Sequence, residues 1–218
     1  MAVGRRTWLM TLTVSFLLAV VIYFGNWNIG INHWLIKDIS KTLPLCVLTI
    51  ITWLAGGRRF AIMPLAFLFS MLGDLAGEHR NFILQIGMFA IAHIFFVINF
   101  SRRAKFDKTA YVCAIIIAIV AIVLGVTIVP NIAKSIEQYA CSFYILLITI
   151  MAISAVAQQS AYRWWYIAAA VLFMFSDSCI AWNRFIGKIP YAGAIIMATY
   201  FAAQYIFARQ YIKEKILK

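Results

Sequence analysis

The sequence has few charged residues. They occupy 12% of the 218 positions, and acids are the scarcest, with 7 Asp and Glu against 19 Lys and Arg. A soluble domain carries about 25% charged residues. Hydrophobic residues reach 65% and the mean hydropathy is +0.92. Water-soluble folding cannot hide so much apolar surface, so a soluble globular domain and a disordered chain are both excluded, and the solvent must be a lipid bilayer.

Motifs for metal and nucleotide chemistry are also missing. With three histidines and no His-Glu-x-x-His, His-x-x-x-His or Cys-x-x-Cys pattern, the sequence predicts no metal and no other cofactor. The absence of Gly-x-Ser-x-Gly and of a glycine-rich phosphate loop disfavours a serine hydrolase and a nucleotide enzyme. The four cysteines lie inside apolar runs, which favours buried thiols over a disulfide framework.

Long apolar runs dominate what is present. A helix needs about 20 residues to cross the hydrocarbon core of a bilayer. Eight runs have this length or nearly so: 8–25, 36–55, 60–77, 82–100, 109–129, 138–157, 164–182 and 190–208. The connections are short, so we expect an all-α polytopic membrane protein, a bundle of eight transmembrane helices, forming a single domain over residues 1–218.

The basic residues predict the orientation. Thirteen of the 19 Lys and Arg fall on the side that would hold both termini and six on the other side. By the positive-inside rule, both termini are expected in the cytoplasm. Because the chain is short and lacks long tails, a bacterial inner membrane is expected in preference to the endoplasmic reticulum. These cations lie in short blocks between apolar runs, which indicates contact with lipid head groups and no nucleic-acid partner. The first run follows Arg5 and Arg6 and is interpreted as an uncleaved anchor, with a cleaved signal peptide as the alternative.

Two acids fall inside the predicted spans, where a charge is costly. Asp74 ends the stretch Phe69-Ser70-Met71-Leu72-Gly73, and Asp177 ends Phe173-Met174-Phe175-Ser176. Both spans run outward from the cytoplasm, and at about 1.5 Å per residue both acids lie about 20 Å from the cytoplasmic edge. The sequence therefore predicts two carboxylates at one depth, in a polar pocket in the outer half of the bilayer.

Further polar residues are expected in or near the same layer. Lys41 precedes the outer end of the second span and is a candidate counter-ion for one aspartate. His93 lies near the middle of the fourth span, and Tyr144, Tyr200 and Gln204 lie in the sixth and eighth. Arg80 and Arg184 follow the outer ends of the third and seventh spans, where the phosphate of a lipid head group would lie. These seven residues are the candidate substrate-binding set.

A pair of carboxylates in a low-dielectric site cannot both ionise cheaply, so one is expected to be protonated beside one that is ionised. That division of roles suits the cleavage of an acid-labile ether, in which one acid protonates and the other carboxylate stabilises an oxocarbenium ion. A vinyl ether lipid is one substrate that fits this chemistry. A proton-coupled transporter that uses the same two aspartates is the alternative, and a lipid-binding or structural membrane protein is a third possibility.

The assembled residues resemble the YhhN-like family of multi-pass membrane proteins, which includes the lysoplasmalogenases. The ordered pieces that carry the resemblance are Lys41-Thr42-Leu43-Pro44, the run Leu68–Asp74, the set Phe82, Gly87, Phe89 and His93, the run Leu172–Asp177 with Ala181, and the run Thr199–Gln204. The resemblance implies eight helices and catalytic roles for Asp74 and Asp177. It also implies hydrolysis of the vinyl ether bond of lysoplasmalogen, releasing a fatty aldehyde and a glycerophospho-choline or -ethanolamine.

The expected partners are therefore a lysophospholipid substrate and membrane lipids, and the sequence carries no signal for an oligomeric state. Polar Ser178 and Cys179 follow Asp177, where the family pattern leads us to expect apolar residues. This departure leaves room for a shifted substrate preference.

Overall fold

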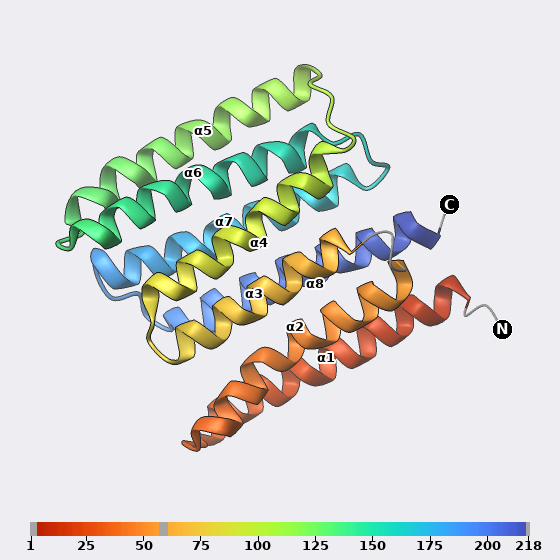
Figure 1. Cartoon of the computed structure of the whole chain (residues 1–218), viewed down its shortest axis with the longest axis horizontal. Helices are drawn as coiled ribbons and strands as arrows, with labels where there is room; N and C mark the ends of the chain where they lie inside the picture. Colours follow the sequence, from red (N-terminus) through yellow and green to blue (C-terminus); the bar gives the residue numbers. More distant parts are fainter. Residues whose placement is uncertain (1–3, 57–60, 217–218) are drawn as a thin grey trace. The chain divides into compact units, whose positions relative to one another are not determined.

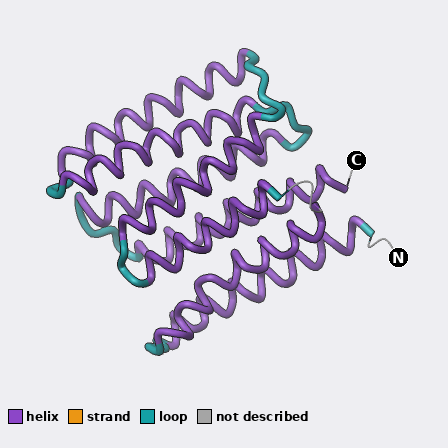
Figure 2. Tube along the Cα trace, viewed as in Figure 1, coloured by secondary structure: helices purple, strands orange, loops and turns teal. Residues whose placement is uncertain are grey.

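A computed structural model describes residues 4–56 and 61–216, and these form helices joined by short turns (Figure 2). The helices are α1 (Arg5–Ile29), α2 (Trp34–Gly56), α3 (Ile62–Glu78), α4 (Phe82–Ser101), α5 (Lys108–Ile128), a short 3-10 helix η2 (Val129–Asn131), α6 (Ser135–Ala157), α7 (Arg163–Phe185) and α8 (Ala192–Ile216). Each of the eight apolar runs corresponds to one α-helix. The all-α fold class is therefore confirmed.

Six of the described helices, namely α1, α2, α4, α5, α6 and α7, are long and apolar enough to cross a membrane. Helix α3 has 17 residues, and α8 combines its apolar residues with a charged final turn that contains Lys213 and Lys215. The six apolar helices support an integral membrane protein. Eight membrane crossings, and with them the cytoplasmic position of both termini, stay predictions.

The described residues fall into two compact units. One unit contains residues 4–56, 61–95 and 207–216, and the other contains residues 96–206. Helices α4 and α8 each contribute residues to both units. The prediction of a single domain stays a prediction.

In the first unit, α2 packs against both α1 and α3 (Figure 1). Glycines allow the helices of this unit to approach closely. A Cβ built on Gly73 of α3 would lie 3.0 Å from the ring of Phe89 on α4, and one built on Gly56 of α2 would overlap the hydroxyl of Tyr211 on α8. Small residues at such contacts are typical of helices that pack inside a membrane.

In the second unit, α6 packs against both α5 and α7 (Figure 1). A cluster of aromatic rings fills the interior next to α7. The ring centroids of Phe173 and Phe96 are 6.2 Å apart, and those of Phe173 and Tyr200 are 5.4 Å apart, both in edge-to-face geometry. Edge-to-face pairs add about 0.5–1.5 kcal/mol beyond the burial of their surface.

The second unit also contains a polar clasp at one end. Asp107 caps the N-terminus of α5 by accepting a hydrogen bond from the Ala110 backbone N–H at 2.7 Å. Its carboxylate also accepts both terminal nitrogens of Arg163, at 2.6 and 2.9 Å. This bidentate arrangement joins the α4–α5 connection to the start of α7.

Hydroxyl groups in the helices mostly bond to their own backbone. Thr49, Thr52, Thr127, Thr149 and Thr199 each donate to the carbonyl of the residue four positions earlier, at 2.6–2.8 Å. An exception is Ser176 of α7, whose Oγ donates to the Ile196 carbonyl of α8 at 3.0 Å. Hydroxyls satisfied within their helix do not require a partner on a neighbouring helix.

Candidate active site

Asp177 lies in α7, a helix long and apolar enough to cross a membrane, and its carboxylate is hydrogen-bonded. The hydroxyl of Tyr144 on α6 donates to Oδ2 of Asp177 at 2.5 Å. This length lies at the short end of the range for a hydroxyl that donates to a charged oxygen. The structure therefore brings together two of the residues singled out from the sequence, across the α6–α7 contact of the second unit.

Tyr200 and Gln204 lie on the same α8 segment of this unit, one helical turn apart. Tyr200 is buried, and its ring packs edge-to-face against Phe173 of α7. Gln204 is 0% exposed, and within the described part of the chain neither atom of its amide has a hydrogen-bond partner. A buried amide without hydrogen bonds lowers the stability of the folded protein by about 1–3 kcal/mol. Gln204 is therefore a candidate to hydrogen-bond a ligand.

Asp74 lies in the first unit, in the last two turns of α3, and its residue is only 4% exposed. The preceding Gly73 contacts the ring of Phe89, which is itself buried. From α1, Tyr23 lies close enough to interact electrostatically with Asp74 and Glu78. The buried acid predicted from the sequence is thus accompanied by a tyrosine from a helix in which no motif was recognised.

Lys41 pairs with Glu78, whereas the sequence analysis expected an aspartate as its counter-ion. The Nζ of Lys41 lies 3.2 Å from Oε2 of Glu78, and the two side chains are 15% and 30% exposed. The correction has a simple geometric reason. Glu78 follows Asp74 by four residues, so both lie on one face of α3, and Glu78 lies one turn closer to the helix end that Lys41 reaches.

The remaining candidates occupy three different settings. His93 is completely buried in α4. Arg80 is exposed in the α3–α4 turn, in the left-handed backbone region with a φ of 56°. Arg184, near the end of α7, donates to both carboxylate oxygens of Glu137 on α6 at 3.3 Å. Arg184 therefore neutralises a buried glutamate within its own unit, a contact that the sequence analysis did not predict.

Several polar residues of the two units were not singled out from the sequence as site residues. They are Tyr23 on α1, Glu78 at the end of α3, the pair Asp38 and His79, whose Oδ2 and Nε2 are 3.0 Å apart, and Glu137. The four-residue spacing of Asp74 and Glu78 was the available signal for Glu78. Within the described residues, no group of three or more His, Cys, Asp or Glu side chains is arranged to hold a metal ion.

The sequence pattern that defines the YhhN family matches residues 36–211, most of the chain. The chain belongs to the YhhN family. The matched part contains both aspartates and all seven candidate substrate-binding residues, and it leaves α1 outside. No solved structure matches the chain.

Individual proteins of known name are similar to this chain over nearly its full length. The chain is 27% identical to bovine and human proteins named lysoplasmalogenase TMEM86A, over 93% of this chain and 89% of each relative. It is 25% identical to rat lysoplasmalogenase TMEM86B, over 98% of this chain and 87% of that protein. The match to this branch of the YhhN family therefore includes every helix that carries a candidate site residue.

Proposed function

We propose that this protein is a membrane-embedded hydrolase that cleaves the vinyl ether bond of a lysoplasmalogen. The observation that carries the proposal is the carboxylate of Asp177, held by Tyr144 inside an apolar helix bundle. Intramembrane carboxylates are costly and mark functional sites. The similarity to proteins named lysoplasmalogenases over nearly the whole chain supports this reaction above other uses of such a group.

The proposed reaction consumes one water molecule. A protonated carboxyl group gives its proton to the alkene carbon farther from the ether oxygen, which leaves an oxocarbenium ion. Water adds to the carbon next to oxygen and loses a proton to a carboxylate, which forms a hemiacetal. The hemiacetal hydroxyl then loses its proton to a carboxylate, a carboxyl group protonates the glycerol oxygen, and the bond between that oxygen and the carbon breaks. A fatty aldehyde and a glycerophospho-choline or -ethanolamine are released.

We assign different roles to the two acids. A hydroxyl that donates to a carboxylate stabilises negative charge on it, so Asp177 is assigned to stabilise the oxocarbenium ion. Asp74 is assigned as the proton donor. Tyr144 is then a positioning residue, because it acts on the substrate through Asp177.

The other candidates are assigned to substrate binding. Buried His93, Tyr200 and Gln204 offer polar groups beside the apolar interior, and the unsatisfied amide of Gln204 suits the glycerol hydroxyls of a lysolipid. Lys41 orients Glu78 on the outer side. Exposed Arg80 and Arg184 are assigned to the phosphates of the surrounding membrane lipids, on the side opposite the proposed cytoplasmic termini.

Transport receives less support from the geometry than hydrolysis. Transporters that carry ions through a membrane commonly bind them at breaks in their helices. Pro44 lies inside α2, yet that helix continues from Trp34 to Gly56, and α3 and α7 are also continuous. Unbroken helices that carry an acid fit a fixed catalytic site better than a moving ion path.

The decisive experiment supplies purified protein in lipid nanodiscs with 1-alkenyl lysophosphatidylethanolamine and measures aldehyde release. Asp74→Asn and Asp177→Asn are each expected to abolish turnover, because each removes one of the two required proton-transfer or charge-stabilising groups. The double variant is expected to be no worse than either single variant, since both acids serve the same step.

Glu214→Gln provides the matched control, because it removes an acid from the last turns of α8, outside the proposed site. It is expected to retain wild-type turnover. Near-wild-type aldehyde release by both aspartate variants would reject the proposal, and so would uptake of the lysolipid into liposomes without any hydrolysis.

A further inference from the structure

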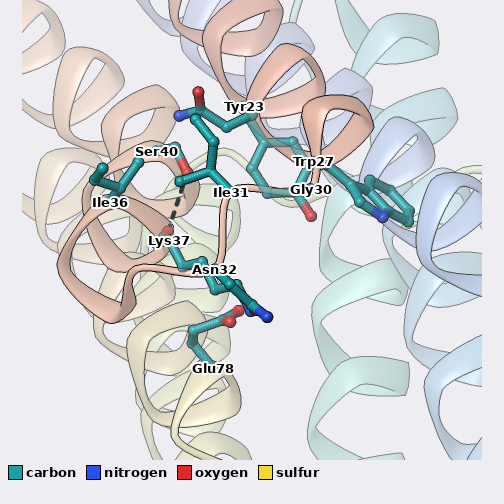
Figure 3. A pocket seen from close by; sticks show the side chains of 10 residues that line it. Tyr23, Trp27, Gly30, Ile31, Asn32, Ile36, Lys37, Ser40 and Glu78 are labelled. Carbon is teal, nitrogen blue, oxygen red and sulfur yellow. Dashed lines mark hydrogen bonds between the residues drawn. The ribbon is translucent and has the colours of Figure 1, made fainter.

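The first unit contains a polar pocket that the reaction described above does not use. It has a volume of about 320 Å³ and lies between the end of α1, the start of α2 and the end of α3 (Figure 3). This volume lies at the lower end of the range of small-molecule pockets, about 300–1,000 Å³. The size suits a small polar group such as a head group.

One part of the pocket wall is anionic and aromatic. Glu78 lines it from α3. Lys41 contacts its Oε2, and within the described residues its Oε1 makes no hydrogen bond. Tyr23 and Trp27 line it from α1, with ring centroids 6.1 Å apart. A carboxylate oxygen and aromatic rings that line one pocket are a combination that attracts an ammonium group.

Another part of the wall is cationic. Lys37 lines it from α2 and donates from Nζ to Oδ1 of Asn32 at 2.7 Å. Within the part of the chain that the structure describes, Lys37 makes no ion pair, unlike Lys41. An unpaired ammonium next to an amide is suited to a phosphate, which accepts hydrogen bonds from both.

Figure 3 shows that Glu78 on α3 and Lys37 on α2 extend toward the same space, with Asn32 beside them. Two opposite charges in one small pocket are complementary to a zwitterion and not to a simple anion or cation. We propose that this pocket binds the phosphoammonium head group of a lysophospholipid, with the phosphate at Lys37 and the ammonium at Glu78. This inference rests on the proposed function, since it names the part of the substrate that the pocket holds.

The position of the pocket relative to Asp74 agrees with this assignment. Glu78 lies four residues beyond Asp74 on the same face of α3, a rise of about 6 Å along the helix. Tyr23 contributes to the pocket and also interacts electrostatically with both acids. A head group held at Glu78 therefore leaves the glycerol and its ether bond one helical turn away, at the level of the proposed proton donor.

Binding can be measured without turnover by using a saturated 1-alkyl lysophosphatidylethanolamine, which has no vinyl ether to cleave. We expect the full-length protein in nanodiscs to bind this lipid at least tenfold more tightly than the corresponding lysophosphatidylglycerol, which lacks the ammonium. Glu78→Gln is expected to abolish this preference. Lys37→Met is expected to weaken binding of both lipids about tenfold, and Lys105→Met, on an exposed residue of the second unit, to change neither.

Glu78→Gln removes the partner of Lys41 and can destabilise the fold, so the melting temperature of each variant is recorded. Lys37→Met breaks no ion pair, so a loss of binding in this variant can be attributed to the missing ammonium even if Glu78→Gln does not fold. Unchanged affinity in both folded variants overturns the proposal. Equal affinity for free glycerophosphoethanolamine and for the lysolipid also overturns it, because the pocket would then bind a soluble phosphodiester and not a lipid.

The same variants separate this inference from the proposed reaction. Head-group binding that depends on Lys37 and Glu78, without aldehyde release from a vinyl ether lysolipid, rejects the hydrolase and retains the pocket. Aldehyde release with an unchanged KM in both variants rejects the pocket and retains the hydrolase. The expected result is a KM raised about tenfold for the ethanolamine lipid, with kcat within a factor of two of the wild type.

Discussion

The hydroxyl of Tyr144 donates a hydrogen bond of 2.5 Å to the carboxylate of Asp177. The two residues lie on neighbouring helices, α6 and α7, which pack along the second unit. The contact fixes the orientation of the carboxylate as well as stabilising its charge, so any reaction that uses Asp177 depends on Tyr144 for geometry.

Removal of this hydroxyl is expected to slow the reaction. A hydrogen bond to a charged group contributes about 1.5–3 kcal/mol, so Tyr144→Phe should lower kcat by about ten- to a hundredfold. The measurement is aldehyde release at saturating lysolipid, with its pH profile. Tyr139→Phe, on an exposed face of α6, is the control and should leave kcat unchanged. Full activity in Tyr144→Phe would show that the contact has no part in the reaction.

Gly73→Ala is expected to destabilise the protein next to Asp74. The added Cβ would lie 3.0 Å from the ring of buried Phe89, so the α3–α4 contact must shift, at a cost of about 1–3 kcal/mol. Gly87→Ala on α4 is the matched control, because a Cβ there has no neighbour within 4 Å. The melting temperature of Gly73→Ala should be clearly below that of Gly87→Ala. Equal melting temperatures would mean that the α3–α4 contact accommodates a methyl group freely.

The clasp between Asp107 and Arg163 predicts a pH dependence of stability. The bidentate guanidinium of Arg163 and the Ala110 backbone N–H lower the pKa of Asp107 well below its ordinary range. A group whose pKa is lowered by folding stabilises the folded state above its unfolded pKa and loses this effect as the pH falls through the folded pKa. Stabilisation by Asp107 is therefore expected in full at neutral pH and should decrease progressively below about pH 4.

Thermal unfolding of Asp107→Asn at several pH values checks this prediction. The variant should melt below the wild type at pH 7, and the difference should narrow as the pH falls below 4. Lys105→Met, two residues away and exposed, should show no such convergence. A constant difference at all pH values would mean that capping of α5, and not the charge of Asp107, provides the stabilisation.

The orientation predicted from the basic residues can be tested by labelling. In a chain whose four cysteines are replaced by alanine, Arg102→Cys should react with an impermeant maleimide only after the membrane is opened. Lys188→Cys should react in intact spheroplasts. Both positions are exposed, and three helices, α5, α6 and α7, lie between them, so an odd number of crossings separates the two positions if all three span as predicted. Labelling of both from one side would contradict the eight-span topology.

Hydrophobic run length was sufficient to predict the eight helices. In a membrane protein the length of an apolar run and the length of a helix share one cause, the thickness of the bilayer. The ends were less certain: α8 continues to Ile216, well past residue 208, because Lys213 and Lys215 extend the helix without adding to its apolar run. Sequence alone therefore located the helices and underestimated the lengths of α1 and α8.

Contacts between side chains were harder to predict than helices. The sequence identified Lys41 as a charge that needs a partner, but the partner is Glu78 and not an aspartate. Asp74 and Glu78 lie one turn apart on α3, and only Glu78 reaches Lys41 near the start of α2. Which of the two acids meets the lysine depends on how the helices pack, and no local sequence pattern encodes this packing. The link from Tyr23 to Asp74 and Glu78 involves a helix outside the family pattern, so no motif could have indicated it.

The threonine hydroxyls that bond to their own helices have a consequence for how this bundle tolerates change. The hydroxyls of Thr49, Thr127 and Thr149 each donate to a carbonyl of their own helix. Substitution of each by valine is therefore expected to have little effect on the packing of the helices. Contacts such as those between Lys41 and Glu78, between Ser176 and Ile196, and between Gly73 and Phe89 then hold neighbouring helices together. The threonines are therefore positions at which the polarity of a helix can change while the contacts between helices are kept.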